Sequence, residues 1–251
     1  MPNVLFRKQG PVAVVTLNRP ERLNAISGPM LDEMHSALMQ AQMDEAIKTI
    51  VLCGAGRAFC AGVDLKEIPE QTASEQVASG FVDKIQQVTR DIMFGGKPVV
   101  GAIQGFAVGG GFEWLFNCDL VVAAQDLVCF FPEMSWGQFV TGGVTHLLPQ
   151  AVGHQRAMEL WLLGEKQSAE TLHRLGLVNR VVPKEKVLET AIALAEKISE
   201  RSTFTVSRLK KMVNTQLSGQ LAAALQLEAE ATSSAMGNED TKRRVAGFSG
   251  R

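Results

Sequence analysis

The sequence predicts an α/β fold with a largely parallel sheet, followed by an all-helical C-terminal region. Short apolar runs, typical of buried strands, alternate with segments of helical spacing between residues 12 and 131. Because alternating strands and helices favour parallel pairing, we expect one α/β body. Beyond Pro183 only helical spacing remains, which predicts a boundary near residue 190. The expected division is a core over residues 1–190 and a helical region over residues 191–251.

The individual elements follow from apolar spacing and capping residues. The expected strands are five apolar runs bounded by turn residues: 12–17, 49–53, 98–103, 120–124 and 128–131. Ser27 is expected to cap a helix from about Gly28 to Asp44, because a serine side chain accepts a hydrogen bond from an early helical N–H. Gly164 and Gly176 are expected to end two further helices. The polar stretch of residues 69–80 is expected to be flexible, and three C-terminal helices are expected within 187–198, 209–213 and 221–231.

Composition and charge narrow the possible classes of function. The 251 residues are 46% hydrophobic, and their net charge of -1 gives no general attraction to nucleic acid or to an anionic membrane. No apolar run is long enough to cross a bilayer, and no signal-peptide pattern opens the chain. The four histidines form no cluster with ligand spacing, so we expect no metal site. The four cysteines show no Cys-x-x-Cys spacing and predict reduced thiols, hence a cytoplasmic location.

A glycine-rich turn is the first candidate site. Gly109, Gly110 and Gly111 lie between the apolar run 98–103 and residues that return to helical spacing. A helix start leaves N–H groups unpaired and carries the positive end of the helix dipole, which favours an anion or an oxygen that becomes one during a reaction. Glu113 would project from the first turn beside that oxygen. The same residues also fit a plain tight turn in which Glu113 only complements the dipole.

A second turn of the same kind lies upstream, where Gly54-Ala55-Gly56 ends the run 49–53. Two such units in one chain can each direct one N–H at a shared point. A dinucleotide site at residues 54–59 is poorly supported, because the third glycine of the fingerprint is missing. A serine hydrolase is no better supported, because no Gly-x-Ser-x-Gly occurs.

Four segments together resemble the crotonase (enoyl-CoA hydratase/isomerase) superfamily: NRPERLNA (18–25), AFCAGVDL (58–65), GFAVGGGFE (105–113) and LGLVNRVVP (175–183). They occur in the order that the superfamily has and cover nearly the whole chain. The resemblance implies a ββα spiral core with a C-terminal all-helical oligomerisation region. It also implies an acyl-CoA thioester substrate and association into a homotrimer or a dimer of trimers. No nucleic-acid or membrane partner is expected.

The resemblance assigns roles to four residues. The backbone N–H groups of Val63 and Gly110 would form the oxyanion hole that stabilises the enolate of the thioester. Glu113 would activate water, and Glu133 would protonate the α-carbon, because two close carboxyls keep a proton available near neutral pH. Without the resemblance, Glu133 would pass for an exposed loop acid. The implied activity is syn hydration of a 2-enoyl-CoA; the alternative is an enoyl-CoA isomerase or a hydrolase of a specialised acyl-CoA.

Further residues would bind the substrate. By resemblance, Ala61, Asp64 and Leu65 line the arm of coenzyme A, and Lys66 and Arg22 lie near its phosphates. Coenzyme A is part of the substrate, so no separate cofactor is expected.

The chain departs from the superfamily pattern after Glu133. Thr141 stands where a glycine is common, and Trp136 and Phe139 add bulk near the expected acyl pocket. These departures favour a short or flat acyl group, aromatic or alicyclic. The C-terminus also stops soon after Phe248, earlier than in members whose tail covers the adenine.

Overall fold

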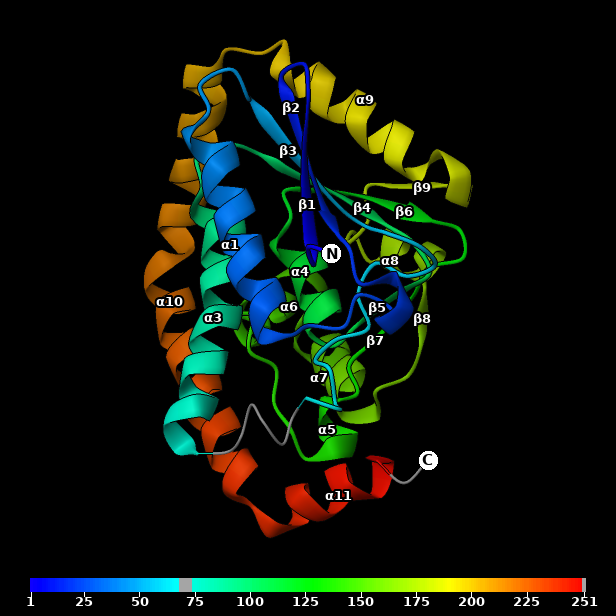
Figure 1. Ribbon diagram of the computed structural model, residues 1–251, viewed down its shortest axis with the longest axis vertical. Helices are drawn as coiled ribbons and strands as arrows, with labels where there is room; N and C mark the ends of the chain where they lie inside the picture. Colours follow the sequence, from blue (N-terminus) through cyan, green and yellow to red (C-terminus); the bar gives the residue numbers. More distant parts are fainter. Residues whose placement is uncertain (68–73, 250–251) are drawn as a thin grey trace.

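Strands of three to six residues form a central sheet in the computed structural model, which describes residues 1–67 and 74–249. The sheet has the strand order β1-β2-β3-β4-β6-β9 (Figure 1). The first two strands pair antiparallel, and every other pair is parallel, as the alternation of strands and helices predicts. The strands are β1 Val4–Gln9, β2 Val12–Leu17, β3 Thr49–Gly54, β4 Val99–Ile103, β6 Leu120–Ala124 and β9 Arg180–Val182.

Both faces of the inner strands β2, β3, β4 and β6 are buried, which explains why these strands are almost continuously apolar. One face packs in the main core with α1 (Gly28–Met43) and α3 (Glu75–Phe94), two helices that lie side by side in Figure 1. Alternate residues of the same strands, such as Val51 and Val100, point to the other face and pack against α9 (Val187–Ser199). The boundary expected near residue 190 therefore falls inside a helix that covers the sheet.

The capping residues act as the sequence predicts. Ser27 precedes α1, and its side chain accepts a hydrogen bond from the N–H of Met30 at 3.4 Å. Gly164, with a left-handed φ of 59°, ends α7 (His154–Leu163). The remaining short helices are α6 Val144–Val152, α8 Ala169–Arg174, and the 3-10 turns η1 Pro20–Arg22 and η2 Lys184–Lys186.

A second, smaller sheet positions the candidate site. Its order is β5-β7-β8, with bounds Phe106–Val108, Val128–Phe130 and Gln167–Ser168. Strands β5 and β7 are parallel, with Val108 opposite Phe130. Helix α4 (Gly110–Asn117) follows β5 and helix α5 (Glu133–Trp136) follows β7. Because parallel strands end at the same edge, residues that follow both strands meet there.

The C-terminal region differs from the three helices expected. After α9, residues 203–237 form one continuous helix, α10 (Thr203–Gly237), which runs along α3, and α11 (Glu239–Ser249) turns beneath α5 (Figure 1). Apolar spacing suggested two helices here because the buried stripe of α10 includes polar side chains and Gly219 lies between its halves. The buried stripe consists of Lys210, Asn214, Leu221, Leu225, Glu228, Thr232 and Ala235.

The polar stretch 69–80 is only partly described. Residues 75–80 begin α3, with Ser74 as the cap, rather than forming a flexible segment. Residues 68–73 of that stretch lie outside the described residues. Within residues 1–67 and 74–249, every helix is too short or too polar to cross a lipid bilayer.

Candidate active site

Close backbone contacts join the two glycine turns. The N–H of Cys60 donates to the carbonyl of Phe106 at 3.0 Å, and the N–H of Val108 donates to the carbonyl of Cys60 at 3.0 Å. Gly62 has a φ of 84°, and a Cβ there would lie 2.8 Å from the carbonyl oxygen of Val108. Only glycine allows this conformation and this approach, so the residue after Gly62 is held next to the start of α4.

Residues 18–25 form hydrogen bonds that hold the turn at residues 55–61. The Asn24 side-chain amide donates to the carbonyl oxygens of Ala55 and Ala58, both at 2.9 Å. Leu23 accepts a hydrogen bond from the N–H of Ala61 at 3.0 Å. Leu23 and Asn24 both have left-handed φ angles, 53° and 55°, which are uncommon for residues with a side chain. The conformation is kept by these hydrogen bonds to the neighbouring turn.

Val63 and Gly110, one from each glycine turn, line the same cavity. Residues 62–64 bond to Ile26 on one side, through Ile26 N–H to Gly62 oxygen (2.8 Å) and Asp64 N–H to Ile26 oxygen (3.0 Å). Because backbone groups of extended residues alternate in direction, the N–H of Val63 points away from Ile26. Gly110 is the first residue of α4, whose N–H has no carbonyl of the helix to bond. Within the described chain neither N–H has an intramolecular acceptor, and both residues line the cavity.

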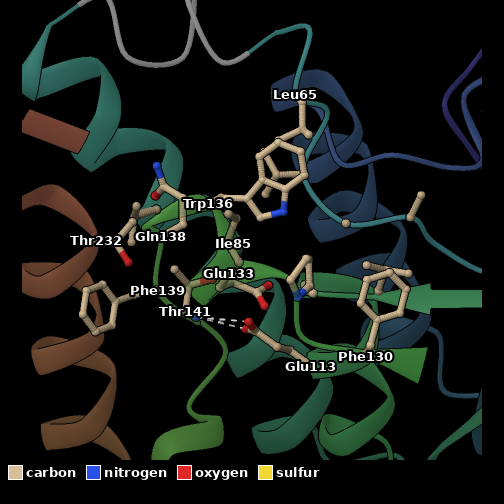
Figure 2. Close-up of a pocket in the computed structure, with 18 of the residues that line it drawn as sticks. Leu65, Ile85, Glu113, Phe130, Glu133, Trp136, Gln138, Phe139, Thr141 and Thr232 are labelled. Carbon is tan, nitrogen blue, oxygen red and sulfur yellow. Dashed lines mark hydrogen bonds between the residues drawn. The ribbon is translucent and has the colours of Figure 1, made fainter. Parts of the chain in front are cut away.

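The cavity has a volume of about 410 Å³ and a largely apolar wall. Figure 2 shows the carboxyl groups of Glu113 and Glu133 directed toward one another within it. Its other labelled members come from several elements, among them Ile85 of α3 and Thr232 of α10. Aromatic side chains line much of the wall: Phe81, Phe106, Phe130, Trp136 and Phe139.

Packing beneath the cavity fixes the two glutamates relative to each other. The ring of Phe112, just before Glu113, stacks on the ring of Phe131, with centroids 4.6 Å apart. Gly109 has a φ of 52°. A Cβ at that position would collide with Oε1 of Glu133. The glycine therefore provides both the backbone conformation and the space that the Glu133 carboxyl occupies.

Burial gives both carboxyls a raised pKa. The pKa of Glu113 lies well above its usual range, first because of burial and then because of the charges of Glu133 and Glu228. Hydrogen bonds from the backbone N–H groups of Thr141 (3.1 Å) and Gly142 oppose this rise. Burial also raises the pKa of Glu133 to about 8. Its Oε2 is buried and has no hydrogen-bond partner among the described residues. The pair can therefore hold one proton near neutral pH.

The residues expected to bind the substrate fall into two groups. Ala61 and Leu65 line the cavity. Asp64 is instead buried in an ion-pair cluster, with Arg19 and Arg22 each 3.2 Å away, and it accepts a hydrogen bond from the N–H of Lys66 at 3.2 Å. Asp64, Lys66 and Arg22 therefore shape the turn from outside the cavity wall, and their contact with the substrate stays a prediction.

The family model described as enoyl-CoA hydratase/isomerase matches residues 7–251. The chain belongs to this family. A probable enoyl-CoA hydratase of Rhizobium meliloti is 35% identical over 245 residues, covering 98% of this chain and 94% of the relative. A probable mitochondrial enoyl-CoA hydratase of Dictyostelium discoideum is 34% identical over 241 residues, 96% of this chain and 86% of the relative.

Membership of the enoyl-CoA hydratase/isomerase family extends to the whole fold. The crystal structure of an enoyl-CoA hydratase/isomerase from Mycobacterium paratuberculosis superposes with a TM-score of 0.92 at 27% identity and covers 98% of each chain. The crotonase-type α/β architecture with a helical C-terminal region is thereby confirmed.

The sequence patterns did not lead to Glu228, a further buried acid near the site. Glu228 of α10 is 3% exposed and lies close enough to Glu113 to raise its pKa. A signal was present: Leu221, Leu225 and Thr232 are spaced from Glu228 at helical intervals on one face. A glutamate on the buried face of a helix needs hydrogen-bond donors nearby, so this spacing predicts a polar contact between Glu228 and another element.

Proposed function

We propose that the chain is an enoyl-CoA hydratase, which adds water syn across the double bond of a 2-enoyl-CoA thioester. This proposal depends mainly on one observation. Two buried carboxyls face one another in a cavity that is also lined by two residues whose backbone N–H groups have no intramolecular acceptor among the described residues. The names of the relatives from Rhizobium meliloti and Dictyostelium discoideum support the same reaction.

The N–H groups of Val63 and Gly110 are the proposed oxyanion hole. As water attacks the β-carbon, negative charge develops on the thioester oxygen. Two fixed donors stabilise that enolate more than the ground-state carbonyl, and each such donor typically lowers the barrier by about 2.7–4 kcal/mol. Both donors belong to the backbone, and hydrogen bonds and close packing of the turns hold them in place.

The two glutamates are the proposed acid and base. Burial raises the pKa of both carboxyls, so the pair holds a proton near neutral pH, and Glu133 is the proposed donor of that proton to the α-carbon. Glu113, held by the N–H groups of Thr141 and Gly142, accepts the proton of the attacking water. The charge of one carboxylate favours the protonated form of the other, which suits a pair that exchanges one proton per turnover.

Replacing each acid with its amide tests this proposal. Glu113→Gln and Glu133→Gln should each lower the hydration of crotonyl-CoA by at least about a hundredfold, since each loses a general acid or base. Coenzyme A binding, measured by calorimetry, should stay unchanged. Glu230→Gln is the matched control, because Glu230 is exposed on α10. Undiminished turnover in either active-site variant would contradict the two-carboxylate mechanism.

The alternative reactions use the same oxyanion hole. Product analysis separates them: crotonyl-CoA gives a 3-hydroxyacyl-CoA with a hydratase, a 3-enoyl-CoA gives a 2-enoyl-CoA with an isomerase, and free coenzyme A appears with a hydrolase.

The aromatic wall of the cavity supports a short or flat acyl group. Trp136 and Phe139, added to three further phenylalanines, leave apolar space suited to a small chain or a ring. Thr141 is also buried there and narrows the site relative to glycine. A series of 2-enoyl-CoA substrates of increasing chain length, with one aromatic member, tests this: kcat/KM should be highest for the short or aromatic substrates. A strong preference for long chains would contradict it.

Substrate binding would use the arm of coenzyme A along residues 61–66. Ala61 and Leu65 line the cavity, and Lys66 and Arg22 are proposed to approach the phosphates. Lys66→Ala should raise KM for crotonyl-CoA with little change in kcat. The proposal needs no cofactor besides the coenzyme A of the substrate itself.

The chain is further proposed to form a homotrimer or a dimer of trimers. Large apolar side chains are exposed on α10 and α7, a pattern that favours association: Phe204, Leu209, Met212, Val213, Leu162 and Leu163. Light scattering after gel filtration should give three or six times the chain mass. The cytoplasmic location, and the absence of nucleic-acid and membrane partners, stay predictions.

A further inference from the structure

The backbone from Thr141 to Thr145 lies between two buried carboxylates from different helices. On one side, the N–H groups of Thr141 and Gly142 donate to Glu113 of α4. On the other, the N–H groups of Gly143 (2.7 Å) and Thr145 (2.9 Å) donate to Glu228 of α10. The Thr145 hydroxyl adds a third hydrogen bond to Glu228 at 2.6 Å.

The position of Glu228 is itself fixed. Helix α10 packs along α3, and the side-chain amide of Gln86 donates to the carbonyl of Leu225 at 2.7 Å, one turn before Glu228. The Glu228 carboxylate also lies at the N-terminus of α6, where helix N–H groups are free to donate. Burial raises its pKa, and the three hydrogen bonds from Thr145 and Gly143 oppose that rise.

We propose that Glu228 is a positioning residue for the reaction: it holds residues 143–145, and so keeps the preceding two amides oriented on the Glu113 carboxylate. This inference rests on the proposed function. Hydrogen bonds to a charged acceptor are stronger than neutral ones, so an ionised Glu228 fixes the segment better than a neutral side chain would. A loosely held segment would let the Glu113 carboxylate rotate away from Glu133.

The charge of Glu228 has a second, separable effect. The charged groups that face Glu113 are Glu133, from α5, and Glu228, from α10. Both are acidic, and both raise the pKa of Glu113. Neutralising Glu228 therefore lowers the pKa of Glu113, and the acidic limb of the pH–rate profile moves to lower pH. A residue that only stabilised the fold would not move that limb.

The test compares Glu228→Gln, Thr145→Val and the control Glu230→Gln. Glu228→Gln should lower kcat for crotonyl-CoA about tenfold to a hundredfold, as small misplacements of catalytic groups do, with KM within about twofold of wild type. Its acidic limb should shift to lower pH. Thr145→Val removes one donor and keeps the charge, so it should lower kcat less and leave the limb in place. Glu230→Gln should behave as wild type.

Two results would overturn the inference: a wild-type kcat and pH profile in Glu228→Gln, or a loss of rate that follows only the fraction of unfolded protein while the profile stays fixed. Should Glu228→Gln fail to fold, Glu228→Asp keeps the charge at a shorter reach. It should leave the limb in place and lower kcat, and an unchanged kcat would contradict the positioning role.

An infrared titration separates this inference from the proposed reaction. The carboxyl band that Glu113→Gln removes identifies Glu113, and its midpoint should fall in Glu228→Gln whether or not crotonyl-CoA is hydrated. If wild type hydrates no enoyl-CoA but the midpoint falls, the proposed function fails and the coupling stands. An unmoved midpoint contradicts the coupling.

Discussion

Relative to wild type, Glu133→Gln should have a free energy of unfolding that becomes more favourable to the folded state as the pH rises. The pKa of Glu133 rises from an ordinary 4.5 to about 8 on folding, because burial disfavours the charged form. Since the folded-state pKa is the higher one, the stability linked to this proton is fully present below pH 4.5 and is lost as the pH rises toward 8. Glutamine never ionises and so avoids this loss.

The size of the effect follows from the two pKa values. Each pH unit between them costs the folded state about 1.36 kcal/mol. From pH 5 to pH 7 the free energy of unfolding of wild type should fall by about 2.5 kcal/mol relative to Glu133→Gln. The lowered pKa of Glu113 in the variant acts in the same direction, because Glu133 is one of the charges that raise it.

Urea unfolding of both proteins at pH 5, 6 and 7 measures this difference. Protomer concentration must be constant, because association would add to apparent stability. Glu230→Gln should show no pH-dependent difference from wild type. A difference between wild type and Glu133→Gln that stays the same at all three pH values would refute the reasoning, because it would mean that Glu133 titrates as an exposed acid.

Three further predictions concern the same fold. Hydration should fall as the pH rises above about 8, because Glu133 then loses the proton it must donate; a rate that is flat to pH 10 would contradict this. Gly109→Ala should lower kcat at least about a hundredfold, because its Cβ would displace the Glu133 carboxyl; wild-type kinetics would contradict it. Lys210→Met should lower the free energy of unfolding by about 3 kcal/mol, because buried Lys210 bonds to Asp119 (2.6 Å) and the carbonyl of Ile92 (2.7 Å); an unchanged urea midpoint would argue against it.

Local sequence signals predicted the parts of the fold that depend on neighbours along the chain. The apolar runs of β2, β3, β4 and β6 and the caps at Ser27 and Gly164 each follow from a few adjacent residues, whereas β1 and β9 of the same sheet were not predicted. Glu113 was identified because it follows a glycine-rich turn at the start of a helix, where unpaired N–H groups favour an anion. Glu133 carries no such signal, and only the resemblance to a family pointed to it, since its partner lies twenty residues away in the sequence.

Contacts between distant segments could not be predicted. The ion pairs of Asp64 with Arg19 and Arg22, which lie 45 and 42 residues earlier, have no local signal in the sequence. Glu228 accepts a hydrogen bond from the N–H of Gly143, which lies 85 residues earlier in the sequence. The continuity of α10 also depends on tertiary packing, because polar residues on its buried stripe are satisfied only by groups from other elements, as Lys210 is by Asp119.

The parallel pair β5 and β7 has a consequence for sequence change in this chain. One residue of a strand spans about 3.3 Å, so a single insertion between Val108 and Gly110, or between Phe130 and Glu133, would move one carboxyl by more than the length of a hydrogen bond. Side-chain identities at these strand ends can therefore diverge while the number of residues stays constant. New activities on this scaffold should arise by substitution at fixed spacing, and length variation should collect in loops on the opposite edge.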